Sequence, residues 1–91
     1  MAETTQLEIV TPVRIMAQQA VEMIVAPGVE GLFGVLPRHA PILADLTRGV
    51  VELHQNGKIT DRYMIDGGLA DVSGERVTIL AERAIHLGSA D

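Results

Sequence analysis

The segment 49–66, GVVELHQNGKITDRYMID, gives the strongest indication of the fold in this 91-residue chain. Its Asn56–Gly57 pair suits a two-residue hairpin turn, because asparagine and glycine tolerate the positive φ angles that such a turn requires. The apolar run of GVVELHQ precedes the pair, and Tyr63 and Ile65 fall on one face after it, with the two-residue period of a strand. The segment therefore predicts an antiparallel β-hairpin.

Short β-branched segments extend from this hairpin in both directions. They are QLEIVT (6–11), VRIMA (13–17), AVEMIVAP (20–27), LADV (69–72) and RVTILAE (76–82). Turn signals separate them, at Pro12, at Gly67–Gly68 and at the SGE sequence of 73–75. A turn about every eight to twelve residues, without a sustained helical stripe, predicts an all-β sandwich or barrel. EMIVA (22–26) and VTILA (77–81) are apolar on both faces, so each outer face is either a docking surface or covered by a second sheet.

Composition excludes several classes of function. The 91 residues suffice for one domain, which we place at 1–91. A net charge of −5 repels nucleic acid, and with Phe33 and Tyr63 as the only aromatic residues no stacking platform exists for bases. The absence of cysteine excludes disulfides and thiolate metal sites. MAETTQLEIV lacks the basic start of a signal peptide, and no apolar run approaches the roughly 20 residues of a membrane span. We expect a soluble intracellular protein that meets a membrane only through partners.

The groups that could perform catalysis do not converge in the sequence. The histidines have no metal-ligand spacing, the serines lie outside any nucleophile motif, and the carboxylate pairs alternate along strands as solvated side chains do. These candidates are His39, His54 and His86; Ser73 and Ser89; and the pairs Asp66/Asp71 and Glu22/Glu52. We expect no catalytic residue, no metal and no cofactor, with His54 and His86 solvated.

The segment 31–41, GLFGVLPRHAP, is stiff and apolar. Gly28, Gly31 and Gly34 recur at three-residue steps, which fits neither a dinucleotide-binding motif nor a P-loop, and we expect them to provide positive φ angles in tight turns. Prolines at 37 and 41 reduce the entropy that the loop loses on binding a partner. The apolar side chains Leu32 and Phe33 either form a docking surface or cap the core.

Three ordered motifs carry a family resemblance. VAPGVEGLFGVLPRHAPIL (25–43), YMIDGGLADV (63–72) and RVTILAERA (76–84) resemble the N-terminal domain of the epsilon subunit of F-type ATP synthases, from about Leu7 to Ala84. The resemblance implies a ten-stranded β-sandwich of two five-stranded sheets. It also implies a non-catalytic rotor subunit of a proton-translocating enzyme, located peripherally at the cytoplasmic face of the bacterial inner membrane.

The resemblance further implies two partners within the ATP synthase complex. The residues placed against the c-subunit ring are Val29, Glu30, Gly31, Leu32 and Phe33. Those placed against the gamma subunit are Thr11, Arg38, His39 and Ala44. A free-standing sensor of a small ligand is the alternative function, and it would require a pocket with convergent polar groups.

This chain departs from the family pattern at three positions. Arg38 stands where the family usually has glycine, which predicts that this backbone does not require a positive φ and that the cation adds a contact to gamma or to a ring loop. Leu32 replaces a residue that is often acidic, so an apolar ring contact is expected, and Asp66 replaces serine before the Gly67–Gly68 turn. The family usually continues into two C-terminal helices. Either this subunit lacks that inhibitory element, or the helices have been removed from a longer chain.

Overall fold

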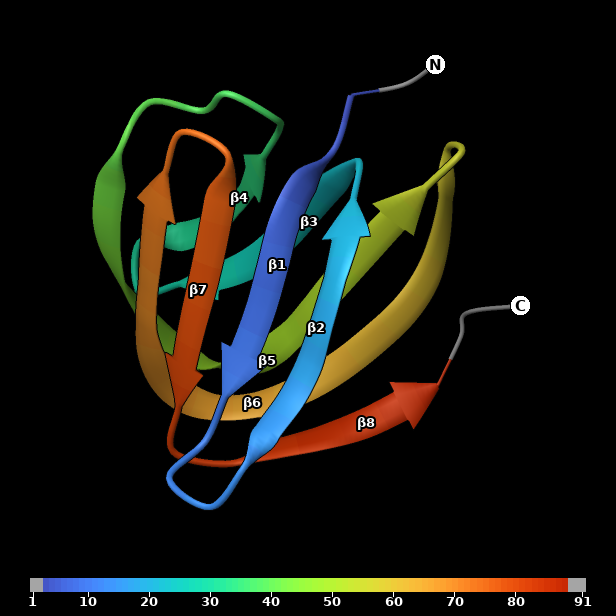
Figure 1. Ribbon diagram of the computed structural model, residues 1–91. Coiled ribbons are helices and arrows are strands. Elements are labelled where there is room, and N and C mark those ends of the chain that lie inside the picture. The colour runs from blue at the N-terminus through green and yellow to red at the C-terminus, as the bar shows by residue number, and fades with distance from the viewer. Residues whose placement is uncertain (1–2, 89–91) are drawn as a thin grey trace.

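The computed structural model describes residues 3–88, which form eight β-strands and no helix (Figure 1). The strands are β1 (Thr5–Val10), β2 (Ile15–Val21), β3 (Met23–Gly28), β4 (Gly31–Val35), β5 (Ile42–Gln55), β6 (Lys58–Ser73), β7 (Arg76–Ala81) and β8 (Ala84–Gly88). The predicted all-β class is confirmed, and Ser89 lies outside the described residues.

The strands hydrogen-bond in the order β2-β1-β7-β6-β5-β3-β4, and β8 pairs with β6 beside this path. Every pair is antiparallel except β1–β7, which is parallel. β5 and β6 are long and curve, so that each belongs to two layers (Figure 1). One layer contains β2, β1 and β7, together with residues 68–73 of β6 and 42–46 of β5. The other layer contains β3, β4 and β8, together with the remaining parts of β5 and β6.

The expectation of ten separate strands in two sheets is wrong in number, because β5 and β6 each run unbroken through both layers, and the Gly67–Gly68 pair of β6 is not a turn. Both glycines lie inside β6, with φ angles of 77° and 141°, and β6 passes from one layer to the other through them. Each layer does contain five strand segments when the two long strands are counted by halves. Asp66 accordingly lies in a bent strand and not in a turn.

The Asn56–Gly57 hairpin is confirmed. The two residues have φ angles of 53° and 73°, and β5 and β6 pair on either side of them. The side chains of Gln55 and Glu22 fix the hairpin to the β2–β3 corner. Gln55 Nε2 donates to the Ala20 carbonyl at 2.7 Å, and the backbone N–H of Asn56 donates to Glu22 Oε1 at 2.7 Å. Glu22, expected to be a solvated carboxylate, instead accepts this bond.

The core lies between the two layers. Its fully buried side chains include Ile9, Ile24, Leu53, Ile65 and Ile79. Alternation along β7 places Val77, Ile79 and Ala81 inside, whereas Leu80 points outward and is 46% exposed. One face of the VTILA segment therefore fills the core, and the other lies on the surface of the described chain.

Candidate functional site

The turn of the β3–β4 hairpin carries exposed apolar side chains, and its base is held in place. Val29 and Leu32 are 61% and 74% exposed, while the half-buried Phe33 packs against the core. The Val29 amide donates to the Asp45 carbonyl at 3.0 Å, and this bond holds the turn of the hairpin against β5. The sequence left open whether Leu32 and Phe33 cap the core or form a docking surface. Phe33 packs against the core, and Leu32 lies on the surface.

The three glycines of this hairpin have different roles. Gly31 alone has a positive φ, of 130°, as the turn requires. Gly28 lacks one, but a Cβ there would lie 2.9 Å from the Gly31 carbonyl oxygen and 3.1 Å from the Phe33 ring, so close packing requires it. Gly34 has neither property. The expectation of positive φ angles is correct for Gly31 and wrong for the other two.

A groove of about 420 Å³ runs between this hairpin and the start of β5. The five residues expected to contact the ring all line it, together with Gly28 and residues 43–45. Leu43 is 69% exposed and contributes an apolar side chain that sequence reasoning did not single out. Ala44, expected at the surface, is half-buried and packs against the core. Val29, Leu32 and Leu43 are defined here as the apolar tip.

The β4–β5 loop contains a left-handed arginine. Arg38 has a φ of 66°, so the expectation that its backbone needs no positive φ is wrong. The conformation is held by neighbours: the Arg38 amide donates to the Gly74 carbonyl at 3.2 Å, and the His39 amide donates to the Leu36 carbonyl at 3.1 Å. The Arg38 guanidinium lies 2.8 Å from Glu3 in a pair exposed on both sides.

Arg38→Gly is expected to raise the free energy of unfolding by about 0.5–1 kcal/mol, because glycine adopts a left-handed conformation without the steric cost of a Cβ. Loss of the exposed ion pair between Arg38 and Glu3 should reduce this gain in the free energy of unfolding only slightly. Urea denaturation followed by circular dichroism measures the difference, with Arg38→Ala as the control that removes the ion pair and keeps the Cβ. A glycine variant no more stable than the alanine variant would contradict the argument.

The residues expected to contact gamma do not form one cluster. Thr11 is buried at the end of β1, where its hydroxyl lies 3.2 Å from the Arg14 carbonyl. The β1–β2 connection lies at the opposite end of the sandwich from the β4–β5 loop that carries Arg38 and His39 (Figure 1). The structure thus brings the five ring candidates together and divides the gamma candidates among three places: Arg38 and His39 on one loop, Ala44 in the groove of the ring candidates, and Thr11 at the other end.

A second apolar surface was missed by sequence reasoning. Val13, Ile15 and Ile85 are 85%, 53% and 62% exposed. Val13 and Ile85 line a groove of about 410 Å³ between the β1–β2 connection and the start of β8. The signal in the sequence was the alternation of Val13 and Ile15 in VRIMA, which indicates that both lie on one face but not that this face is exposed.

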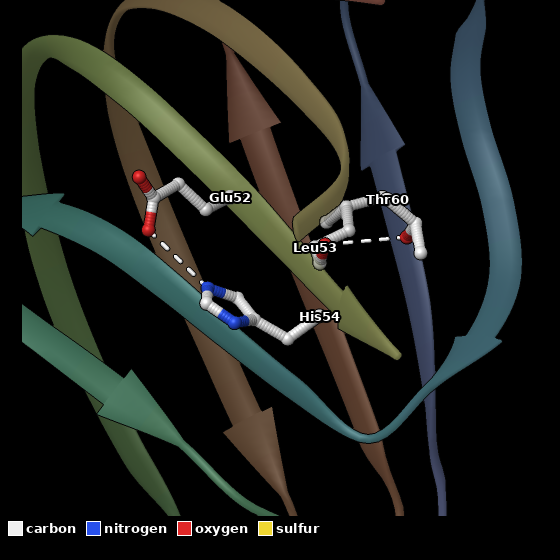
Figure 2. A network of polar contacts seen from close by, with 4 residues as sticks. All are labelled: Glu52, Leu53, His54 and Thr60. Carbon is white, nitrogen blue, oxygen red and sulfur yellow. Dashed lines mark hydrogen bonds and ion pairs between the residues drawn. The ribbon is translucent and has the colours of Figure 1, made fainter. Parts of the chain in front are cut away.

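The two histidines expected to be solvated, His54 and His86, both have specific partners, and His86 is exposed as expected. His54 is half-buried, with Nε2 3.2 Å from Glu52 Oε1, and Thr60 Oγ1 donates to the Leu53 carbonyl beside it (Figure 2). The Thr60 bond joins the two strands of the central hairpin, whereas the His54–Glu52 contact lies within β5. Glu52 therefore is not a freely solvated carboxylate, whereas Asp66 and Asp71 are exposed as expected.

His86 connects β8 to β6. Its Nε2 lies 2.6 Å from Asp61 Oδ1, and its ring stacks on Tyr63 with the centroids 4.6 Å apart. Burial, reinforced by the negative charge of Asp61, raises the pKa of the Tyr63 hydroxyl above its usual value. Among residues 3–88, no three His, Asp or Glu side chains gather as metal ligands would, and no helix could cross a bilayer.

Comparison with known proteins adds to this geometry. The family model "ATP synthase, Delta/Epsilon chain, beta-sandwich domain" matches residues 4–87. The ATP synthase epsilon chain of Rhodospirillum rubrum is 45% identical over 89 residues, covering 98% of this chain and 66% of that relative. The chain thus spans just under two thirds of the relative's length.

Two solved structures are similar in fold. A chain of the Euglena gracilis mitochondrial ATP synthase, solved as OSCP/F1/c-ring, superposes with a TM-score of 0.84 at 29% identity, over 92% of this chain and 54% of that one. A chain of the Tetrahymena thermophila central stalk and c-ring gives a TM-score of 0.75 at 14% identity, over 92% of this chain and 67% of that one. By sequence and by fold, this chain belongs to the ATP synthase Delta/Epsilon chain family, as the beta-sandwich domain of an epsilon chain.

Proposed function

We propose that this chain is a non-catalytic central-stalk subunit of a proton-translocating F-type ATP synthase, which binds the gamma subunit and the c-ring and couples ion flow to ATP synthesis. In this role the chain is a single domain, 1–91, attached to the cytoplasmic face of a bacterial inner membrane through its partners. The observation that carries the proposal is the apolar tip, in which Val29, Leu32 and Leu43 are all more than half exposed around one groove.

The construction of the tip suits a contact that must transmit force. Phe33 anchors the hairpin in the core, Gly28 allows the two strands to pack closely, and the Val29 amide is bonded to β5. A loop fixed in this way loses little conformational entropy on binding, so more of the free energy of apolar burial is available for the contact. In this proposal the tip rests on the ring, and the exposed loop that carries Arg38 and His39 lies against gamma, with Thr11 and Ala44 as further gamma contacts.

Leu32→Asp is expected to weaken rebinding of the assembled F1 sector to stripped membranes about tenfold or more, because burial of a leucine side chain contributes roughly 1.5–3 kcal/mol. Urea unfolding and binding to purified gamma should not change, since Leu32 is 74% exposed. Val13→Asp is the matched control, because Val13 is exposed and lies away from the tip.

The two arms of this experiment separate the proposals. Membrane affinity unchanged by Leu32→Asp would remove the ring assignment of the tip. Failure of the wild-type chain to bind purified gamma would overturn the stalk function itself.

A further inference from the structure

Strand β8 is attached to the fold along one side only. It pairs with residues 62–65 of β6, and the register shifts between Arg62 and Tyr63. Within residues 3–88 no other strand pairs with it, and Figure 1 shows it at the margin of the fold, below β6. Its backbone bonds are thus shared with a single neighbour over five residues.

The side chains of β8 bury little apolar surface. Ile85 and Leu87 are 62% and 40% exposed, and Ala84 alone packs against the core. β7, a strand of similar length, buries Val77 and Ile79 almost completely. Because the free energy of opening a segment follows the apolar area that it buries, β8 should open at a lower free energy than β7.

One side chain of β8 makes specific contacts that compensate for the small burial. The Nε2–H of His86 donates to Asp61 Oδ1 at 2.6 Å, and the His86 ring lies at 25° to the Tyr63 ring in a stacked arrangement. Both partners belong to β6, so these contacts hold the middle of β8 to the one strand that pairs with it among residues 3–88. We define Asp61, Tyr63 and His86 as the β8 clasp.

We propose that β8 opens as a separate unit while the rest of the sandwich stays folded, and that the β8 clasp sets how often it opens. Opening uncovers the Tyr63 ring and frees the edge of β6 at residues 62–65. This local opening is independent of the function proposed for the apolar tip.

Native-state hydrogen exchange of the full chain tests this proposal. Amides in β8, and those amides of residues 62–65 that bond to β8 and not to β5, should exchange faster than the amides of β1 and β7. His86→Ala should speed their exchange about tenfold and leave β1 and β7 unchanged, as expected for loss of a hydrogen bond to a carboxylate. Leu87→Ala is the control, because Leu87 neighbours His86 and takes no part in the clasp. Exchange of β8 at the same rate as β7, or equal acceleration of all strands in His86→Ala, would overturn the proposal.

Tyr63 supplies a second measurement, because the chain contains one tyrosine and no tryptophan. Its ultraviolet absorbance should titrate above the ordinary pKa of 10.0 in the wild type, since burial and Asp61 raise the pKa. In His86→Ala the midpoint should fall toward that ordinary value as the ring becomes solvated. An unchanged midpoint, in a variant that remains folded, would show that His86 does not cover Tyr63.

Discussion

Gly68→Ala is expected to lower the free energy of unfolding by more than about 4 kcal/mol, an unusually large effect for the addition of one methyl group. Gly68 lies in β6 with a φ of 141°, which L-residues rarely adopt, and a Cβ at this position would overlap the carbonyl oxygen of Leu80. That oxygen belongs to the backbone of β7, which pairs with β6 at this point, so no side-chain rotation can relieve the overlap. Either β7 separates from β6, or the bend between the layers is lost.

Circular dichroism without denaturant and urea titration of any folded fraction measure this effect. Because small domains are stable by only about 5–15 kcal/mol, much of the variant should be unfolded. Gly74→Ala is the matched control: Gly74 also has a positive φ, of 46°, but a Cβ there meets nothing within 4 Å. Gly74→Ala should lower the free energy of unfolding by about 1–2 kcal/mol, from backbone strain alone. Similar losses in the two variants would mean that the approach of Leu80 does not limit the bend.

Comparison of Gly67–Gly68 with Asn56–Gly57 shows what the local sequence can and cannot predict. Asn56–Gly57 was interpreted correctly because the residues that require positive φ stand between two strands of matched pattern, and the turn needs no distant contact. Gly67–Gly68 carries the same local signal. Whether such a pair reverses the chain or bends a continuous strand depends on β7, which pairs with β6 at Gly68 but follows it in the sequence.

The candidate site was predictable to a similar degree. The ring candidates are consecutive in sequence, so one hairpin brings them together, and the apolar character of Leu32 was visible directly. Leu43 joins the tip only because β5 lies beside the β3–β4 hairpin, and His86 meets Tyr63 only because β8 pairs with β6. Arg38 was misjudged because its left-handed backbone is held by the Gly74 carbonyl, a contact across 36 positions of the chain that no local rule contains.

Ile79→Ala is expected to lower the free energy of unfolding by about 2–5 kcal/mol, the range for truncating a large aliphatic side chain in a closely packed core. Ile79 is fully buried in β7 and pairs with Ile9 of β1 on one side and Ala70 of β6 on the other. Ile79 belongs to a buried cluster to which both layers contribute, so we expect the cavity left by truncation to close only if the layers approach each other. The midpoint of urea unfolding should fall with an unchanged dependence on urea concentration, as for a loss of stability in the same folded state.

Leu80→Ala is the matched control for this prediction, because the next residue of the same strand points to the opposite face. Leu80 is 46% exposed, so its truncation removes contacts only from the outer surface and should change the free energy of unfolding by less than about 1 kcal/mol. A cost for Leu80→Ala equal to that of Ile79→Ala would place both faces of β7 in a packed interior. That result would contradict a structure in which one face of VTILA fills the core and the other remains available to a partner.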